Sequence, residues 1–585
     1  MKRCPECRRD YYDDTLLYCL DDGNALLEGP ANKSEPPAVA GGLTPSFDDD
    51  VEPQTAILHS TAAPGEAATR AQIHMTDQTA VLPSGKDDVV PKPRGLDKRL
   101  LAAPFLVAII VLGGFFGYRY LKPAATEQIN SIAVLPFENR SGNSDTDYLS
   151  DGLAESLIYR LSQLPSLKVS PTNSVLRYKG KDTDVAQIAK ELEVDAVMSG
   201  RLTQRGDDLT ISVELTDART KKLIWAEQYV RKMSDLLATQ REIAGTVTQK
   251  LQLKLSGDDA KGLTKSYTND NEAYQLYLRG RFYWNKRTTE SLKTAIEQFK
   301  AASEKDPNFA LAYVGLADSY LVGQYSLRGK DKEAVPLAKA YATRAFEIDP
   351  SLVEVNATLG LVDTFSWNWT EAEKYYKRAL ELNPNYPSAR HWYSRYLREM
   401  GKYDEAYEQI RQAQTADPLS LAISNNVGES LLEKGDIQGA IAESRRTLEI
   451  GTSWVPYRTL AHCYLRLGQK DEALANARKS AESLNGSAIT LKVLGYVQGA
   501  IGNRTEASAI AREIEDKFAK GEADGRDVAV VYAGLGENDK VFEWLEKDFQ
   551  NRNTSLTELR LEFPFAPLRS DPRFKDLAKR MNLPE

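Results

Sequence analysis

Three of the four cysteines stand near the start of the chain, at Cys4, Cys7 and Cys19, and Asp22 follows the last of them. Cys4 and Cys7 form a C-x2-C turn, a spacing that directs two thiolates at one metal ion. Cys19 and Asp22 repeat the spacing with a carboxylate in the last position, which is a less common zinc ligand. A segment this short has too little core to fold without such a staple. The pattern predicts a structural zinc ion bound by these four residues, and the alternative is a disordered, reduced tail.

Residues 1–29 resemble the short zinc-ribbon domains at the N-terminus of many bacterial membrane proteins. The family pattern, C-P-x-C...Y...C-x-x-D-G, is carried here by Cys4, Cys7, Tyr12, Cys19, Asp22 and Gly23. Asp22 stands where a set of four cysteines would place its last thiolate. The resemblance implies a ribbon that makes protein contacts, because a closed four-ligand site leaves no open position for a substrate.

Few other residues are suited to catalysis. The sequence has four histidines, and residues 127–257 contain neither histidine nor cysteine. Asp151 and Glu155 are four residues apart, and we expect them on a solvated helix face rather than as an acid pair. The first 99 residues carry no G-x-G-x-x-G, H-R-D or D-F-G motif, which argues against a protein kinase. We therefore expect no enzymatic activity.

Residues 100–118 read LLAAPFLVAIIVLGGFFGY and contain no charged residue. Such a run is typical of a transmembrane helix, since about 20 apolar residues span the hydrocarbon core. More basic residues precede the run than follow it, namely Lys92, Arg94, Lys98 and Arg99 against Arg119 and Lys122. Because basic residues concentrate on the cytoplasmic side, we predict one helix at 99–121 in a bacterial inner membrane. The N-terminus would be cytoplasmic and the C-terminal region periplasmic.

Residues 30–98, rich in Pro, Ala and Asp, are predicted to form a disordered linker.

Residues 127–257 alternate between strand and helix patterns. A short apolar strand is expected at 131–137, a half-buried strand at 209–216, a hairpin turn at 205–208, and helices at 148–164, 185–194 and 233–253. This order indicates an α/β sandwich. The region resembles the TolB-like amino-terminal domain through residues 132–137, 148–152, 178–181 and 225–229. That resemblance implies a fold outside the membrane, in bacterial proteins with a kinase or a DNA-binding domain inside, and it implies no reaction.

Residues 271–555 repeat with a period close to 34 residues. Helix-stopping pairs follow one another at intervals of 43, 34 and 34 residues, as Asp306-Pro307, Asp349-Pro350, Asn383-Pro384 and Asp417-Pro418. In one unit Gly360 and Ala372 hold small positions near Tyr376, where two antiparallel helices must approach closely. The pattern is typical of tetratricopeptide repeats (TPR). It predicts an all-α superhelix of about eight helix pairs, followed by a capping segment at 556–585.

The first helix of each repeat lines the concave face of such a superhelix. On the usual repeat geometry the inward positions include His391, Arg395, Asn425, Arg458, His462 and Lys492. A mildly basic lining with hydrogen-bond donors suits an acidic or carboxyl-terminated peptide. The alternative is a solvated face of mixed charge, because Glu399, Glu429 and Glu433 lie nearby in the sequence.

The chain as a whole has 585 residues and a net charge of -8, which argues against a chain-wide basic surface for nucleic acid. The sequence predicts a multidomain protein with a small zinc ribbon, one transmembrane helix, a TolB-like α/β domain and an all-α TPR superhelix. We expect a non-enzymatic scaffold that binds proteins or peptides through a TPR groove outside the cytoplasm and signals across the inner membrane. We expect no nucleic-acid partner and no small-molecule substrate. The alternative is a membrane-anchored transcription regulator, or a relative of signalling kinases, that has lost its effector domain.

Overall fold

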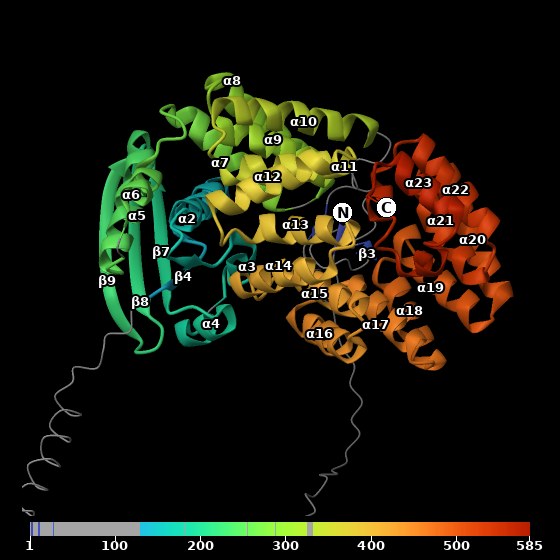
Figure 1. Cartoon of the computed structure of the whole chain (residues 1–585). Coiled ribbons are helices and arrows are strands. Elements are labelled where there is room, and N and C mark those ends of the chain that lie inside the picture. Colours follow the sequence, from blue (N-terminus) through green and yellow to red (C-terminus); the bar gives the residue numbers. More distant parts are fainter. Residues whose placement is uncertain are drawn as a thin grey trace, which may run out of the picture. The chain divides into compact units, whose positions relative to one another are not determined.

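The computed structural model describes residues 2–3, 10–11, 27–28, 129–181, 183–253, 255–286, 288–323 and 331–584 (Figure 1). The four predicted zinc ligands, the linker at 30–98 and the predicted transmembrane segment at 99–121 lie outside these residues. Near the N-terminus three two-residue strands pair antiparallel in the order β2-β1-β3, with β1 at Lys2–Arg3, β2 at Asp10–Tyr11 and β3 at Leu27–Glu28. Within the described part of the chain, no helix is long and apolar enough to cross a membrane.

The α/β region is built on a mixed sheet in the order β6-β4-β7-β8-β9, with β5 paired to β7. Strands β6, β4, β5 and β7 pair in parallel, whereas β7, β8 and β9 form an antiparallel meander. The strands are β4 (Ser131–Val134), β5 (Glu138–Asn139), β6 (Lys168–Val169), β7 (Ala196–Arg205), β8 (Asp208–Asp217) and β9 (Lys222–Lys232). The predicted hairpin turn joins β7 to β8, and Gly206 there has a φ of 60°. The predicted alternation in β8 is confirmed, because Leu209, Ile211 and Val213 are fully buried while their neighbours are partly exposed.

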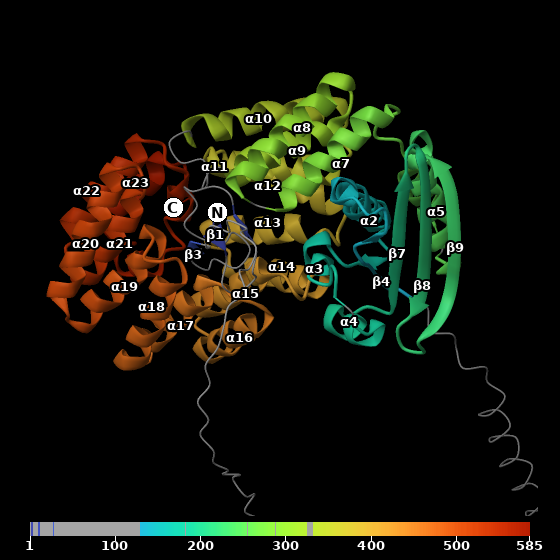
Figure 2. The same cartoon turned by 180° about the vertical axis from the view of Figure 1, so that it is seen from behind.

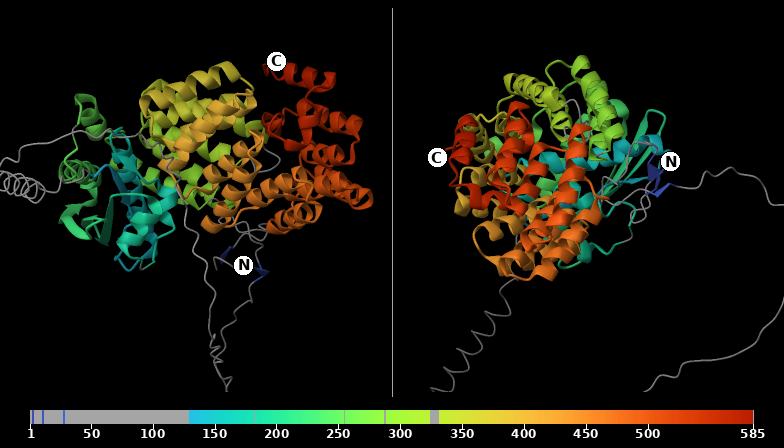
Figure 3. Two further views of the ribbon diagram at one scale, coloured as in Figure 1. Left: turned by 60° about the horizontal axis from the view of Figure 1, so that its bottom comes forward. Right: turned by 90° about the vertical axis from the view of Figure 1, so that its right-hand side faces the viewer.

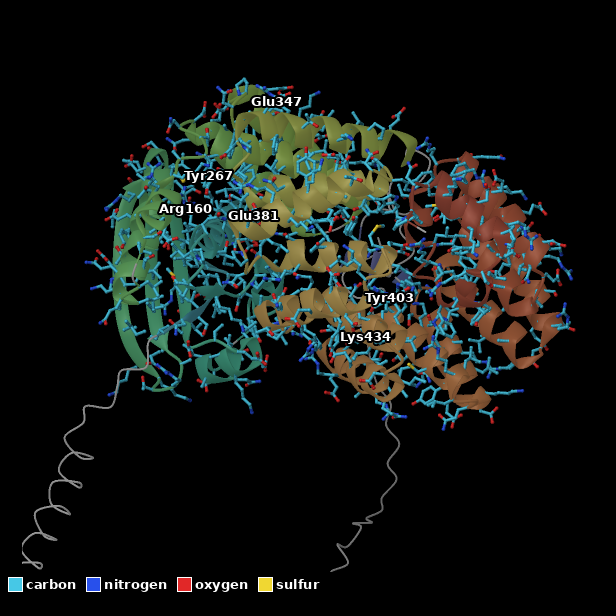
Figure 4. The ribbon with its side chains drawn as sticks, viewed as in Figure 1. Arg160, Tyr267, Glu347, Glu381, Tyr403 and Lys434 are labelled. Atoms are coloured by element: carbon cyan, nitrogen blue, oxygen red, sulfur yellow. The ribbon has the colours of Figure 1, made fainter. Side chains whose placement is uncertain are left out.

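Helices cover this sheet and continue toward the repeats (Figure 2). They are α2 (Asp147–Ser162), α3 (Thr172–Leu176), α4 (Val185–Leu192), α5 (Leu236–Lys250) and α6 (Gly257–Thr264), with single turns η1 (Ser144–Thr146) and η2 (Met233–Asp235). Helices α2 and α5 pack on each other and on the sheet, where Leu149, Leu153 and Val247 enter the core. Arg160 of α2 is buried and donates to the carbonyl oxygens of Leu263 and Lys265. Figure 4 shows Arg160 beside Tyr267, whose ring centre lies 5.6 Å from the guanidinium carbon.

The C-terminal part of the described chain is a TPR-like superhelix of antiparallel helix pairs (Figure 3). The first four pairs are α7 (Asn271–Asn285) with α8 (Thr289–Lys305), α9 (Ala310–Gly323) with α10 (Asp331–Ile348), α11 (Val353–Phe365) with α12 (Trp369–Leu382), and α13 (Pro387–Glu399) with α14 (Tyr403–Ala416). The next four are α15 (Leu421–Glu433) with α16 (Ile437–Ile450), α17 (Trp454–Arg466) with α18 (Lys470–Ser483), α19 (Ala488–Ile501) with α20 (Arg504–Ala519), and α21 (Gly525–Leu535) with α22 (Asn538–Gln550).

The small positions predicted from the repeat have a direct steric cause. A Cβ atom at Gly360 would lie 2.7 Å from the Tyr376 ring, so only glycine lets α11 and α12 pack this closely. Ala372 on the facing helix is fully buried. Gly401 ends α13 with a φ of 75°, a left-handed conformation that stops the helix before α14 begins.

The Asp and Asn residues of the helix-stopping Asp-Pro and Asn-Pro pairs end helices, and they also bind the α/β region. Asp306 accepts a 2.6 Å hydrogen bond from Thr268, and Asp349 pairs with Lys265 at 2.5 Å. Further along the array, Asn383 donates to the carbonyl oxygen of Ser162 at 2.7 Å, and Asp417 accepts from the Ser174 hydroxyl at 2.5 Å. Successive loops of the repeat array therefore contact α2, α3 and the segment that follows α6.

The segment after α22 does more than cover the last repeat. It contains η3 (Thr554–Glu558), η4 (Phe563–Leu568) and α23 (Pro572–Arg580), and α23 packs on α22. The indole nitrogen of Trp369 donates to the carbonyl oxygen of Met581 at 2.7 Å, next to the place where the Trp367 ring stacks on Phe549 of α22. The C-terminal segment thus also contacts the third helix pair, which the predicted capping role did not include.

Candidate functional site

The inner helices bring the predicted groove residues together. His391 and Arg395 come from α13, Asn425 from α15, Arg458 and His462 from α17, and Lys492 from α19. All six line one cavity of 340 Å³. Tyr403 at the start of α14, labelled in Figure 4, also lines it. We call this space the array cavity.

Carboxylates already pair the predicted cations of the array cavity. Arg395 forms an ion pair with Glu558 of η3, and Arg458 forms one with Glu429 of α15. Lys492 is only 1% exposed. Its ammonium lies 2.7 Å from Glu562, which precedes η4, and 3.1 Å from Asp527 of α21. The C-terminal segment therefore supplies part of the cavity wall and part of its negative charge.

The pKa values of the two C-terminal glutamates reflect this pairing. Burial by itself would raise the pKa of Glu562, but Lys492 and Arg526 outweigh it and lower the pKa to about 2. Burial opposes ionisation of Glu558 too, yet Arg526 and Arg395 hold its pKa well below the usual range. Both side chains are therefore carboxylates at neutral pH.

The two histidines contribute no charge at neutral pH. Burial, reinforced by Arg395 and Arg398, lowers the pKa of His391 to about 3. Burial and then Arg458 lower the pKa of His462 to about 3 as well. The Nε2 atom of His391 lies 2.9 Å from the side-chain amide of Asn426, and the His462 ring stacks on Phe563 at 4.7 Å between ring centres. Neutral imidazoles here hold neighbouring side chains in place.

The array cavity also contains cations that the sequence did not predict, namely Arg398, Arg466, Arg526 and Arg569. Arg398 is buried between Glu429 and Glu433, at 3.0 and 2.6 Å. Arg398 lies one helical turn after Arg395 on α13, so this spacing could have predicted that it also lines the cavity. No such signal existed for Arg569, because it lies outside the 34-residue repeat and reaches the cavity only through the C-terminal segment.

Cys463 of α17 lies next to His462 and is buried. Burial raises the pKa of the Cys463 thiol to about 12, so this side chain on α17 stays a thiol at neutral pH. Across the residues with described positions, no group of three or more His, Cys, Asp or Glu side chains is placed to hold a metal ion. The predicted zinc ligands are not among those residues.

Comparison with known proteins gives two family matches. Residues 127–245 match the model of the HilA/YgeH-like transcriptional regulator, second domain, and residues 367–447 match that of the anaphase-promoting complex, cyclosome, subunit 3. The second match runs from the loop before α12 into α16, within the repeats. The first covers the α/β region, for which the TolB-like resemblance stays a prediction.

Curated relatives match part of the chain. A putative adenylate cyclase 3 from Rhizobium meliloti is 31% identical over 246 residues, which is 42% of this chain and 42% of the relative. The transcriptional regulator HilA of Salmonella typhimurium is 25% identical over 323 residues, 52% of this chain and 55% of the relative. The chain therefore spans about half the length of the curated relatives it matches.

Solved structures with detectable similarity include a human IFIT1 dimer with PPP-AAAA. Its TM-score is 0.40 at 16% identity, over 74% of this chain and 94% of that one. PilW, a widely conserved type IV pilus biogenesis factor, gives a TM-score of 0.31 at 19% identity, over 36% of this chain and 94% of that one. The described elements themselves form a small α/β region and a TPR-like superhelix that encloses the array cavity.

Proposed function

We propose that this chain is a non-enzymatic, membrane-anchored scaffold that binds partner proteins through its repeat array and passes information across the inner membrane. TPR-type arrays generally bind proteins, because stacked helix pairs expose an extended concave surface. The observation that carries the proposal is the convergence of six predicted residues from four inner helices on the array cavity. A partner would place an acidic side chain or a chain end there.

The C-terminal segment narrows the kind of contact we propose. Because Glu558, Glu562 and Phe563 occupy one wall, a whole helix does not lie along this part of the groove. An extended chain end needs less width. Asn425 offers it a carbonyl oxygen that is buried and has no hydrogen-bond partner within the described structure.

Site-specific cross-linking tests the proposed surface. A photoreactive side chain replaces Asn425, which lines the array cavity, or Arg478, which is exposed on the outer helix α18. Irradiation of cells carrying the full chain should then cross-link a discrete partner from position 425 and none from position 478. The same cross-linked species from both positions would mean that the partner does not use the concave face.

The membrane anchor and the cytoplasmic zinc ribbon belong to the same proposal and rest on the sequence patterns at 99–121 and 1–29. A reporter that is active only outside the cytoplasm should work when fused after Glu585 and fail when fused near Ser84. The reverse pattern would overturn the proposed orientation.

A membrane-anchored transcription regulator is the second candidate, and the match of residues 127–245 to the HilA/YgeH-like second domain favours it. Such a regulator needs a DNA-binding domain with a basic recognition helix. The first 99 residues offer no such pattern, so we place the regulator second. Tight, sequence-selective retention of DNA by the full chain in a gel-shift assay would reverse this order.

A further inference from the structure

The side chains around the array cavity carry more positive than negative charge. Seven Arg and Lys side chains line it, against the four carboxylates of Glu429, Glu433, Glu558 and Glu562. Asp527 binds Lys492 from α21 and is a fifth counter-charge. Because His391 and His462 are neutral, the cavity keeps an excess of two positive charges.

The excess is localised on two arginines. Arg466 donates to the carbonyl oxygen of Leu432 at 2.9 Å, and its guanidinium lies 4.7 Å from the centre of the Phe563 ring. Arg569 donates to the carbonyl oxygen of Arg560 at 2.6 Å, and its Nε atom is buried without a hydrogen bond. Within the described residues, neither guanidinium forms an ion pair with a carboxylate. Two cations of the cavity wall therefore have carbonyl partners and no counter-ion.

Two further polar atoms of the wall are unsatisfied. Arg526 is 5% exposed, and its Nε atom makes no hydrogen bond within the described structure, although it lies 3.5 Å from the Glu562 carboxylate in an ion pair. The side-chain oxygen of Asn425 is buried and equally without a donor. Buried polar atoms in folded proteins are almost always hydrogen-bonded. The cavity thus offers donors for an anion and one acceptor for a hydrogen-bond donor.

The size of the cavity sets the scale of the ligand. A volume of 340 Å³ is at the lower end of the range for small-molecule sites, which is roughly 300–1,000 Å³. Trp454 and Phe563 add flat apolar surface to a wall that is otherwise polar. An organic molecule with both charge and apolar surface fits this lining better than a bare inorganic ion does.

We propose that the array cavity binds a small organic dianion, a phosphomonoester or a dicarboxylate. Two negative charges balance the excess, and guanidinium groups match the geometry of both phosphate and carboxylate. The site goes beyond the proposed function: the dianion would occupy the same cavity as the partner's acidic group and compete with it, whereas a scaffold that binds no small acid would still capture its protein partner. The sequence predicted no such ligand, because Arg569 lies in the C-terminal segment outside the repeats and Arg466 was not among the predicted groove residues.

Calorimetric titration of the purified full chain with defined probes tests the proposal. Phenyl phosphate and glutarate are the organic dianions and distinguish the two chemistries, benzoate is a monoanion, and benzyl alcohol is neutral. At least one dianion should bind with a Kd of about 0.1 mM or tighter. Benzoate and benzyl alcohol should bind at least tenfold more weakly, because they leave one or both positive charges unbalanced.

Substitutions locate the bound probe. Arg466→Gln should weaken dianion binding about tenfold and Arg466→Glu should abolish it, whereas Arg478→Gln on the outer helix α18 should leave it unchanged. Arg466 and Arg478 are both exposed, so all three variants should keep the parent's circular dichroism spectrum. The proposal is overturned if neither dianion binds, if benzoate binds as tightly as the dianions, or if folded Arg466→Glu binds them like the parent.

Discussion

The Ser174 hydroxyl of α3 donates a 2.5 Å hydrogen bond to the carboxylate of Asp417, which lies 243 residues further along the chain. Asp417 ends α14 and is 6% exposed. Burial raises its pKa to about 6, although the Ser174 bond and the charge of Lys168 act in the opposite direction. This contact between the α/β region and the repeats therefore involves a carboxyl group that titrates near pH 6.

Asp417→Asn should flatten the dependence of stability on pH. The folded-state pKa of about 6 lies above the unfolded value of about 3.9, so the folded chain binds the proton more tightly between these values. The stabilisation is full below about pH 4 and is lost as the pH rises to 6, by up to about 3 kcal/mol for a shift of this size. Denaturant unfolding at several pH values measures it. Exposed Asp471→Asn is the control, and an unchanged slope in Asp417→Asn would contradict the prediction.

Some residues of the array cavity could be predicted from the sequence, and others could not. His391 and Asn425 are 34 residues apart, as are Arg458 and Lys492, so the repeat period alone places each pair at equivalent inward positions. Glu558 and Arg395 are 163 residues apart, and they meet only because the C-terminal segment returns to the inner helices. That return depends on the shape of the whole array, which no local pattern encodes.

The fold, like the array cavity, has features that the local sequence predicts and others that depend on tertiary contacts. The strand alternation in β8 and the small positions Gly360 and Ala372 follow from local periodicity and sterics, and all were predicted. Asp306 and Asp417 were interpreted only as helix stops. Their bonds to Thr268 and Ser174 need knowledge of which surface the α/β region presents, and this is a tertiary property.

Lys492→Met should destabilise the array strongly. The ammonium of Lys492 is fully buried and binds Glu562 and Asp527, so its removal leaves two buried carboxylates, of which Glu562 keeps an ion pair with Arg526 at 3.5 Å. Breaking a buried ion pair from one side costs about 3–5 kcal/mol. Urea unfolding measures the loss.

Exposed Lys470→Met is the matched control and should stay within about 0.5 kcal/mol of the parent. Adding Glu562→Gln to Lys492→Met should recover part of the loss, because one uncompensated charge is then removed. A double variant that unfolds more easily than Lys492→Met would show that the ion pair is not the source of the effect.

Ala406→Leu tests the helix register of the fourth pair. Ala406 of α14 is fully buried, and its carbonyl oxygen accepts a 2.7 Å hydrogen bond from the Ser394 hydroxyl of α13. A larger side chain would push the two helices apart, at a cost of about 1–3 kcal/mol for overpacking. The adjacent exposed Glu405→Ala should leave thermal stability nearly unchanged. Equal melting temperatures for Ala406→Leu and its parent would contradict the packing described for this pair.

The last prediction concerns the metal. If Cys4, Cys7, Cys19 and Asp22 form the proposed site, the purified full chain should contain one zinc ion, and the double variant Cys4→Ser/Cys7→Ser should contain none, because a hydroxyl is a poor substitute for a zinc-bound thiolate. Asp22→Cys should keep the metal and hold it more tightly against a chelator, since it completes a four-thiolate set. Cys463→Ser is the matched control: its thiol is buried in α17, so zinc content should not change. Elemental analysis after dialysis against a chelator measures all four proteins, and equal zinc in the parent and in Cys4→Ser/Cys7→Ser would exclude these ligands.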